Sequence, residues 1–340
     1  IKYLFMKFTI NYNIISILLI LFALISFFLG FYLDEISMGA GGFNGDFKHV
    51  KKSIYIFENN SVLESILLYS ESSNRTPLIY ILHKFMNPFF ESEIGFRRVV
   101  FFISLSIPIL LFLCFKEKFN NTNVIVLLLF TSVIFFNPFF RTSSFWGLEE
   151  NYSYISLLIS LLFLLKFLNP IEKKNFTIFS QLFIITFFSS LCIYFDQKFI
   201  IIPIICFLKI ISSNYKIKFK IFSVVMYLIF SIPFLYLMSI WGGIFPSKIY
   251  DLGNQFFLHH IGFAFTIIAF IFLPFFLLVE ENIFKRISSF FKNYNNYFLL
   301  MIILIYIIFL FFFYDKSFLE NKFDGGGIVK KISFVLFENI

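Results

Sequence analysis

The chain has 340 residues, of which 59% are hydrophobic, 23% aromatic and 14% charged, with a formal net charge of +8 and a mean hydropathy of +0.87. Soluble domains carry about 25% charged residues, so this composition excludes a soluble globular protein and indicates an integral membrane protein. The three cysteines lie inside apolar runs, and the sequence has no CxxC or HxxxH spacing. Both facts argue against a disulfide framework and a zinc site.

Apolar runs long enough to cross a membrane follow one another along the chain. A helical span needs about 20 apolar residues to cross about 30 Å of hydrocarbon. That length predicts spans at 14–33, 97–115, 123–140, 152–168, 177–195, 198–213, 221–241, 261–279 and 297–314, with a tenth after Val329. The fold class expected is therefore an all-α polytopic helix bundle of nine or ten spans, a single domain over residues 1–340. Because the sequence begins at Ile1 and its last run stops in mid-pattern, we expect a fragment truncated at the C-terminus.

Lysine and arginine are unevenly divided between the two sets of short loops. If the N-terminus is inside, the inner loops hold twelve of these residues and the short outer loops hold three. Cytoplasmic loops carry the excess of positive charge, so this orientation is favoured. Topology and anionic lipid then explain the net charge without a nucleic-acid partner.

The segment 34–96 is the one long loop, and this orientation places it outside the cytoplasm. Its stretch "TPLIYILHKFM" (76–86) is too short to span, and Pro77 fits the first position of a helix. Three apolar residues share a face at helical spacing, namely Leu78, Leu82 and Phe85. We interpret this stretch as a helix lying in the membrane interface, with a second, weaker one at 61–70.

Glycine and acidic residues crowd the start of the long loop. Asp34 and Glu35 directly follow the first span, and "GAGGFNGDFKHVKK" (39–52) places four glycines before Asp46. Glycine lets a backbone turn sharply and approach a ligand closely, so this stretch could bring Asp46 over a lipid phosphate. Both features have a simpler explanation: the glycines form a flexible loop tip, and the acidic pair marks where a helix leaves lipid.

Two further polar groups fall on the same outer side. The first is centred on Arg75, followed by His83 on the predicted interfacial helix and by Arg98 at the start of the second span. The second lies in "NPFFRTSSFWGLEENYSY" and holds Arg141, Glu149 and Glu150. Acids ahead of a span also favour the helix dipole, by about 0.3–1 kcal/mol each. A histidine on an interfacial helix is more often a surface residue than a ligand.

Taken together, the three groups favour chemistry on a lipid phosphate, because arginines alternate with carboxylates on one face. A carboxylate can act as general base on an acceptor hydroxyl. Arginine pairs with phosphate through two parallel hydrogen bonds and offsets the charge that grows on a departing phosphate. The sequence therefore predicts group transfer from a lipid phosphate on the outer side of the membrane.

The order of these features resembles the GT-C superfamily of polyprenyl-phosphate-sugar glycosyltransferases, which includes protein O-mannosyltransferases and the lipid A aminoarabinose transferase. The likeness rests on the acids after the first span, on "RTPLIYILHKFMNPFFESEIGFRRVV" and on "NPFFRTSSFWGLEENYSYISLLISLL". The last two are similar to the family's interfacial segment and its second outer loop. The resemblance extends over roughly residues 1–210.

The resemblance implies a polyprenyl-phosphate-linked sugar donor, an extracytoplasmic acceptor (lipid, glycan or protein) and a catalytic carboxylate in the first outer loop. Asp34 and Glu35 match the family's acidic pair by position, whereas Asp46 lies farther from the span. We favour Asp46 as the base and leave Asp34 open. The expected location is the bacterial inner membrane, with the active site on the periplasmic side.

The resemblance also makes Glu149 or Glu150 a candidate for contacting the acceptor substrate or for binding a divalent metal, Mg²⁺ or Mn²⁺, although no cofactor is certain. The remaining substrate-binding candidates are Arg75, His83, Arg98 and Arg141. Asp196 and Lys198 fall in a tight outer turn, and we favour a plain turn over a part of the site for this segment.

Three other classes of protein stay open. A transporter or flippase for lipid-linked sugars would place ionisable groups near mid-membrane, often in two repeated halves, and neither feature is seen in the sequence. An O-antigen-polymerase-like enzyme usually carries its large outer loop late in the chain. In a non-catalytic membrane subunit the clustered acids and arginines would be incidental.

Overall fold

The computed structural model describes residues 12–36, 42, 45–73, 75–169 and 174–243, together with 297, 300, 301, 304 and 305. By its internal contacts the chain divides into two compact units, 1–249 with 327–340, and 250–326. Of the second unit the structure describes only residues 297, 300, 301, 304 and 305, all of them helical. The elements below belong to the first unit.

All the regular elements in the described ranges are helices. In chain order they are α1 (Tyr12–Tyr32), α2 (Asp46–Asn59), α3 (Val62–Ser70), α4 (Leu78–Met86), α5 (Glu93–Ser104), α6 (Ser106–Lys118), α7 (Val124–Ser132), η1 (Val133–Phe136), α8 (Pro138–Trp146), α9 (Glu150–Leu168), α10 (Asn175–Phe195), η2 (Gln197–Ile200), α11 (Ile201–Ile211) and α12 (Ile217–Trp241). The all-α class expected from the sequence is confirmed for this part of the chain.

Five helices in the described ranges are long and apolar enough to cross a membrane: α1, α5 joined to α6, α9, α10 and α12. They match the predicted spans 14–33, 97–115, 152–168, 177–195 and 221–241. Within the predicted span 123–140, α7 with η1 meets α8 at a bend of 65°, where Pro138 follows Asn137, so this pair is a broken span or a re-entrant loop. The described residues therefore support five spans, or six with the bent pair.

Nine or ten spans are not confirmed. The predicted span 198–213 is divided between η2 and α11, and α11 has only 11 residues, too few to cross the hydrocarbon alone. The predicted spans at 261–279, at 297–314 and after Val329 lie wholly or mostly outside the described residues.

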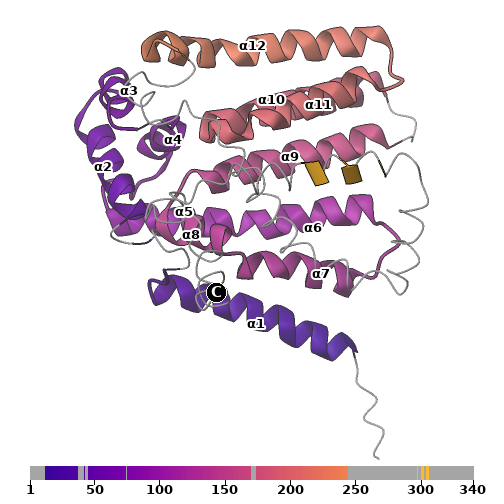
Figure 1. The fold of residues 1–340 in the computed structure, drawn as a ribbon, viewed down its shortest axis with the longest axis horizontal. Helices are drawn as coiled ribbons and strands as arrows, with labels where there is room; N and C mark the ends of the chain where they lie inside the picture. Colours follow the sequence, from indigo (N-terminus) through magenta and orange to yellow (C-terminus); the bar gives the residue numbers. More distant parts are fainter. Residues whose placement is uncertain are drawn as a thin grey trace, which may run out of the picture. The chain divides into compact units, whose positions relative to one another are not determined.

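The long helices of the first unit lie side by side, and the three loop helices α2, α3 and α4 gather at one end of them (Figure 1). α9 packs against α6 and α10, α10 packs against α12, and α7 packs against α1 and α6. The connections from α6 to α7 and from α11 to α12 lie at the opposite end. The long first loop therefore forms a compact layer at one end of the bundle.

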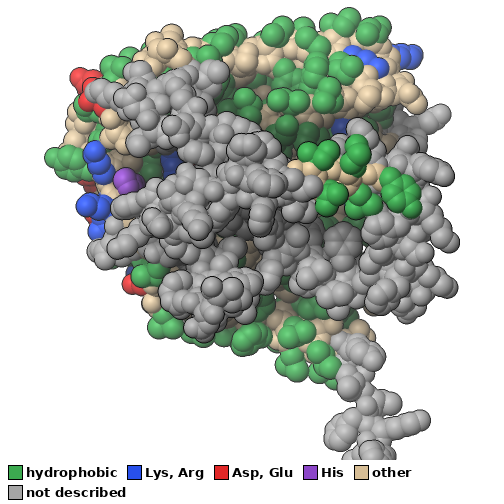
Figure 2. Space-filling model, viewed as in Figure 1, with side chains coloured by type: hydrophobic (Ala, Val, Ile, Leu, Met, Phe, Trp, Pro, Cys, Tyr) green, Lys and Arg blue, Asp and Glu red, His purple; other side chains and the backbone are tan. Residues whose placement is uncertain are grey.

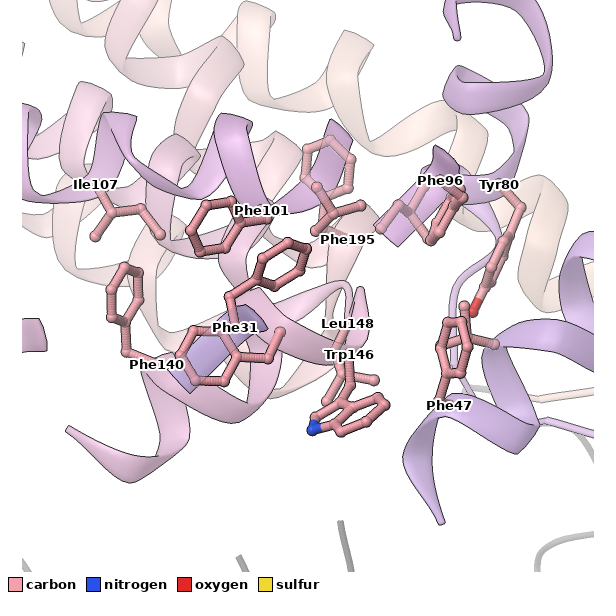
Figure 3. Packing of buried hydrophobic residues seen from close by; sticks show 14 of the residues in the cluster. Phe31, Phe47, Tyr80, Phe96, Phe101, Ile107, Phe140, Trp146, Leu148 and Phe195 are labelled. Carbon is pink, nitrogen blue, oxygen red and sulfur yellow. The ribbon is translucent and has the colours of Figure 1, made fainter. Parts of the chain in front are cut away.

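Aromatic rings join this layer to the spans (Figure 3). The ring of Phe27 in α1 stacks between those of Phe101 and Phe140, with centroids 5.2 and 5.1 Å away. The rings of Phe31 and Phe101 stack at 4.1 Å, and Phe47 of α2 packs against Trp146 of α8 at 5.7 Å. Each such pair contributes about 0.5–1.5 kcal/mol beyond area burial. Asp34 and Glu35 therefore follow an end of α1 that is tightly packed against its neighbours.

The glycine stretch predicts a turn that carries Asp46, but Asp46 is the first residue of the helix α2. The buried residues of α2 recur at helical spacing, namely Phe47, Val50, Ile54 and Phe57. At its far end, the Lys84 ammonium of α4 donates to two terminal carbonyls, those of Phe57 and Asn60, each at 2.6 Å. A cation at a helix C-terminus is favourable, so α4 holds α2 in place. Most of the preceding glycine stretch lies outside the described residues.

The two helices predicted at 61–70 and 76–86 are confirmed as α3 and α4. α3 begins with a capping box, in which Ser61 and Glu64 bond each other's backbone N–H. The buried face of α4 differs from the predicted one. Ile79, Tyr80 and His83 are buried, whereas Phe85 is 70% exposed. His83 is therefore not the surface residue that its position on an interfacial helix suggested.

Candidate functional site

Charged side chains gather at the end of the bundle that carries α2 (Figure 2). Two groups of charged residues there contain most of the candidates that the sequence predicts. We call the first the α1-end ion pairs; they are Asp34 with Arg97 and Glu35 with Arg141. We call the second the Asp46 cluster; it consists of Asp46, Arg75, Glu149, Glu150, Asp196 and Lys198.

Asp34 ends α1 through its backbone. It lies in the left-handed region at φ +53°, which glycine usually fills at the end of a helix. Its N–H donates to the carbonyl of Phe31, and that of Glu35 donates to Gly30, so the two bonds form a Schellman motif. The Asp34 carboxylate is 2.5 Å from the Arg97 guanidinium, which lies 4.2 Å from the Trp146 ring. The simpler reading of Asp34 as a helix end thus has a structural basis.

Glu35 and Arg141 form a bidentate ion pair across 106 positions of sequence. Arg141 is buried, and its remaining donors go to the Phe135 carbonyl at 2.8 Å and the Ser26 carbonyl at 3.0 Å. All three guanidinium nitrogens therefore have partners inside the protein. This arrangement makes Arg141 a link between α1 and α8, and leaves it no donor turned to an outside phosphate.

Replacing Gly30 by Ala is expected to loosen this link. A Cβ at Gly30 would lie 2.5 Å from Glu35 Oε2, 2.8 Å from Phe145 Cε2 and closer still to Arg141 Nη2. Overpacking of this kind costs about 1–3 kcal/mol. A lower melting temperature of the detergent-solubilised protein would show it. Leu29→Ala, on the exposed face of the same helix, is the matched control, and an equal loss from both variants would contradict the steric argument.

The Asp46 cluster centres on the junction between α8 and α9. The Arg75 guanidinium pairs with Glu149 and lies 3.7 Å from Glu150 Oε1. Glu149 is 2% exposed, and burial raises its pKa to about 7; Glu150 adds to this shift and Arg75 opposes it. The sequence candidates Arg75, Glu149 and Glu150 are thus brought together by the fold, although Arg75 is 74 residues from Glu149.

The tight turn at Asp196 and Lys198 belongs to the same cluster. Lys198 Nζ lies 3.4 Å from Asp196 Oδ2 and 3.7 Å from Glu150 Oε1. Asp196 is buried, and its Oδ1 accepts the Lys198 backbone N–H at 3.0 Å, which caps η2. Sequence reasoning favoured a plain turn, because nothing local shows that α10 ends beside the start of α9.

Asp46 completes the cluster from the first position of α2. Burial raises the pKa of its carboxyl, the nearby Arg75 and Lys198 charges lower it, and the Glu150 charge raises it. Unlike Asp34 and Glu35, Asp46 makes no ion pair with any residue that the structure describes. A half-buried carboxylate beside two cations, with a raised pKa and without an ion pair in the described part of the chain, has the properties of a general base.

Of the remaining candidates, Arg98 is exposed on α5 and has no ion pair among the described residues. His83 instead joins α4 to α9. Its Nε2 is 2.5 Å from the Tyr152 hydroxyl, and its Nδ1 is 2.9 Å from Asn87 Nδ2. Asn87 Oδ1 accepts the Phe89 N–H, which fixes the amide so that Nδ2 donates to Nδ1. The imidazole therefore carries its proton on Nε2, and both nitrogens are already bonded.

Acidification is expected to weaken the fold through His83. Burial lowers its pKa to about 4, against about 6.5 in an unfolded chain. Between these values the unfolded chain binds a proton that the folded one does not. The free energy of unfolding therefore falls as the pH drops from about 6.5 to about 4, by about 3 kcal/mol in all.

Melting temperatures measured across that pH range check this expectation. The variant His83→Gln should be less stable at pH 7.5 and should lose less stability on acidification than the wild type. His49→Gln removes an exposed histidine from α2 and is the matched control. Parallel pH profiles for the wild type and His83→Gln would contradict the assignment.

A divalent metal does not fit the acids of the cluster as the structure has them. One oxygen of Glu149 is taken by Arg75, and the described residues contain no group of three or more histidine, cysteine, aspartate or glutamate side chains placed to hold a metal ion. We therefore assign none of these acids as a ligand of Mg²⁺ or Mn²⁺.

Comparison with protein-family models, with curated proteins and with solved structures finds no match to this chain. The features of the protein that bear on its function are therefore the Asp46 cluster and the apolar helices.

Proposed function

We propose that the chain is a membrane glycosyltransferase that moves a sugar from a polyprenyl-phosphate donor to an acceptor outside the cytoplasm. The observation that carries the proposal is the Asp46 cluster. It combines a carboxylate without an ion-pair partner among the described residues, two cations and three further acids at one end of an apolar helix bundle. The GT-C resemblance of the sequence supports the same reading, with the cluster on the periplasmic side.

The proposed reaction uses the side chains of the cluster in three ways. Asp46 accepts the proton of an acceptor hydroxyl as that oxygen forms a bond to the anomeric carbon of the sugar. The bond from that carbon to the phosphate oxygen breaks, and the polyprenyl phosphate leaves with the bonding electrons. Arg75 and Lys198, whose side chains are 37% and 71% exposed, offset its charge. The sugar ends on the acceptor oxygen, and the proton on Asp46.

The loop layer suits a donor that is dissolved in lipid. Phe85, Met86 and Phe89 are exposed at the end of α4 and just after it, where they would contact the membrane interface if this end of the bundle lies at the lipid surface. Arg75 lies just before α4. A polyprenyl phosphate moving in the membrane could thus reach the cations from the side, without leaving the lipid.

Reconstitution tests the proposal. The protein is placed in vesicles with polyprenyl phosphates carrying labelled hexoses or pentoses, and with envelope lipids, glycans and proteins as acceptors. We expect label on an acceptor and an equal amount of free polyprenyl phosphate. Movement of label across the membrane with the donor intact would support a transporter instead. Polymerisation of lipid-linked glycan would support an O-antigen-polymerase-like enzyme. Folded protein with none of these activities would overturn the proposal in favour of a non-catalytic subunit.

A further inference from the structure

The corner where α10 ends beside the start of α9 holds polar groups that the proposed reaction does not use. Glu150 is the first residue of α9, and Asp196 and Gln197 form the turn from α10 into η2. Both carboxylates lie within 4 Å of the same Lys198 ammonium, so they are neighbours in space. We call these three residues, Glu150, Asp196 and Gln197, the α9–α10 corner.

Each member of the corner keeps one buried polar atom without a hydrogen-bond partner in the described part of the protein. These atoms are Glu150 Oε2, Asp196 Oδ2 and Gln197 Nε2. The whole Asp196 side chain is only 6% exposed. Seven buried side-chain atoms of the described residues lack a hydrogen-bond partner, and three of the seven belong to this one corner. Buried polar atoms are nearly always hydrogen-bonded, so their concentration at the corner points to a bound molecule.

The chemistry of these atoms limits what that molecule is. Ionised carboxylate oxygens only accept hydrogen bonds, whereas Gln197 Nε2 only donates them. A phosphate group also only accepts, and it would be repelled by two carboxylates. Hydroxyl groups both donate and accept, so neighbouring hydroxyls on one ring satisfy the two oxygens and the amide together.

Lys198 covers the corner loosely. Its ammonium is 3.4 and 3.7 Å from the two carboxylates, which is beyond good hydrogen-bond distance, and its side chain is 71% exposed. The side chain can therefore swing away without breaking a packed contact. A ring hydroxyl can displace the ammonium from the carboxylate oxygens, and a phosphate bound beside Arg75 would then hold the ammonium away from them.

We propose that the α9–α10 corner is a sugar subsite, in which Glu150, Asp196 and Gln197 bind ring hydroxyls while Lys198 turns to the donor phosphate. This inference rests on the proposed function, because it assigns the sugar of the same donor to this corner. It also makes Asp196 and Gln197 determinants of which sugar is accepted. Buried polar groups that pair with substrate hydroxyls discriminate strongly against analogues that lack them.

Asp196→Asn is the most informative variant, because asparagine keeps the size of the side chain and can still cap η2 through Oδ1. It replaces the acceptor Oδ2 by an NH₂ donor. Gln197→Ala removes the donor and serves as a second variant if the first is poorly folded. Glu93→Gln is the matched control, since Glu93 pairs with Lys51 at 2.6 Å on another part of the same end.

The measurement is binding of octyl glycosides of glucose, mannose, galactose and arabinose, below their micellar concentrations, to the protein in lipid nanodiscs by saturation-transfer NMR. We expect at least one glycoside to bind, and its affinity to fall about tenfold or more in Asp196→Asn and in Gln197→Ala but not in Glu93→Gln. Absence of binding by all four glycosides, or unchanged binding in both corner variants, would overturn the proposal. Inorganic phosphate is the opposite probe, and its displacement of a bound glycoside from the wild type would also overturn it.

This experiment separates the two proposals. If glycosides bind through the corner but no polyprenyl-phosphate sugar is ever consumed, the subsite stands and the transferase assignment fails. If label is transferred and neither corner variant changes glycoside binding or the choice of donor sugar, the transferase stands and the subsite fails.

Discussion

Replacing Asp46 by Asn is expected to lower the rate of sugar transfer by about 10²–10⁴-fold, the usual contribution of a positioned general base. Asparagine keeps the size of the side chain but cannot accept the proton. Binding of the donor should change little, so the loss should appear in kcat. The reconstituted transfer assay, run at saturating donor, measures it. Glu58→Gln, an exposed acid on the same helix, is the matched control and should retain activity.

Asp34→Asn provides the sharpest contrast with this variant. Asparagine tolerates the left-handed backbone of a Schellman motif, so α1 should end as before. Transfer should therefore stay within a few-fold of the wild type. If Asp34→Asn abolishes transfer and Asp46→Asn does not, the base is Asp34 and the Asp46 cluster has another role.

The raised pKa of Asp46 adds a pH signature. The base must be ionised, so kcat/KM should fall on acidification as Asp46 takes up a proton. Because burial raises this pKa, the fall should begin at a higher pH than an exposed aspartate would give. The cations Arg75 and Lys198 limit the shift.

Arg141→Ala is expected to be the most damaging change to the fold. It removes the partner of Glu35 and the guanidinium that donates to the Phe135 and Ser26 carbonyls. Breaking an ion pair from one side costs about 3–5 kcal/mol when both charges are buried, and less here because the Glu35 side chain is 34% exposed. The yield of monodisperse protein and its melting temperature measure the loss. Arg98→Ala removes an exposed arginine from α5 and is the matched control for stability.

A double change tests whether the uncompensated carboxylate causes that loss. If it does, adding Glu35→Gln to Arg141→Met should recover part of the stability that Arg141→Met loses alone, because no unpaired charge then remains at the end of α1. An Arg141→Ala protein as stable as Arg98→Ala would show that the link between α1 and α8 matters little.

The sequence could predict the features that depend on local pattern. An apolar run of about 20 residues dictates a helix in lipid, which is why five of the predicted spans were found. The loop helix α3 was also readable, since Ser61 and Glu64 form a capping box three residues apart. By contrast, α2 was missed because glycines and lysines at its start suggested a loop, although Phe47, Val50, Ile54 and Phe57 already follow a helical period.

The composition of the site depends on contacts that no local pattern contains. Which acids end in ion pairs was decided by partners 63 to 106 positions away, as in Glu35 with Arg141. His83 was taken for a surface residue because its partner Tyr152 lies 69 positions along the chain. The sequence could therefore list the charged residues of the outer side, but it could not divide them into structural ion pairs and a cluster with an uncommitted carboxylate.

The contact of Lys84 with the end of α2 has a mechanical consequence. The helix has 14 residues and so a length of about 20 Å, with Asp46 at one end and the carbonyls bound by Lys84 at the other. A rigid rod of this length turns a tilt of about 3° at the Lys84 end into a displacement of about 1 Å at the carboxylate, enough to spoil the alignment of a proton transfer. The Lys84 ammonium lies outside the Asp46 cluster, yet by fixing the far end of α2 it helps to fix the position of the Asp46 carboxylate.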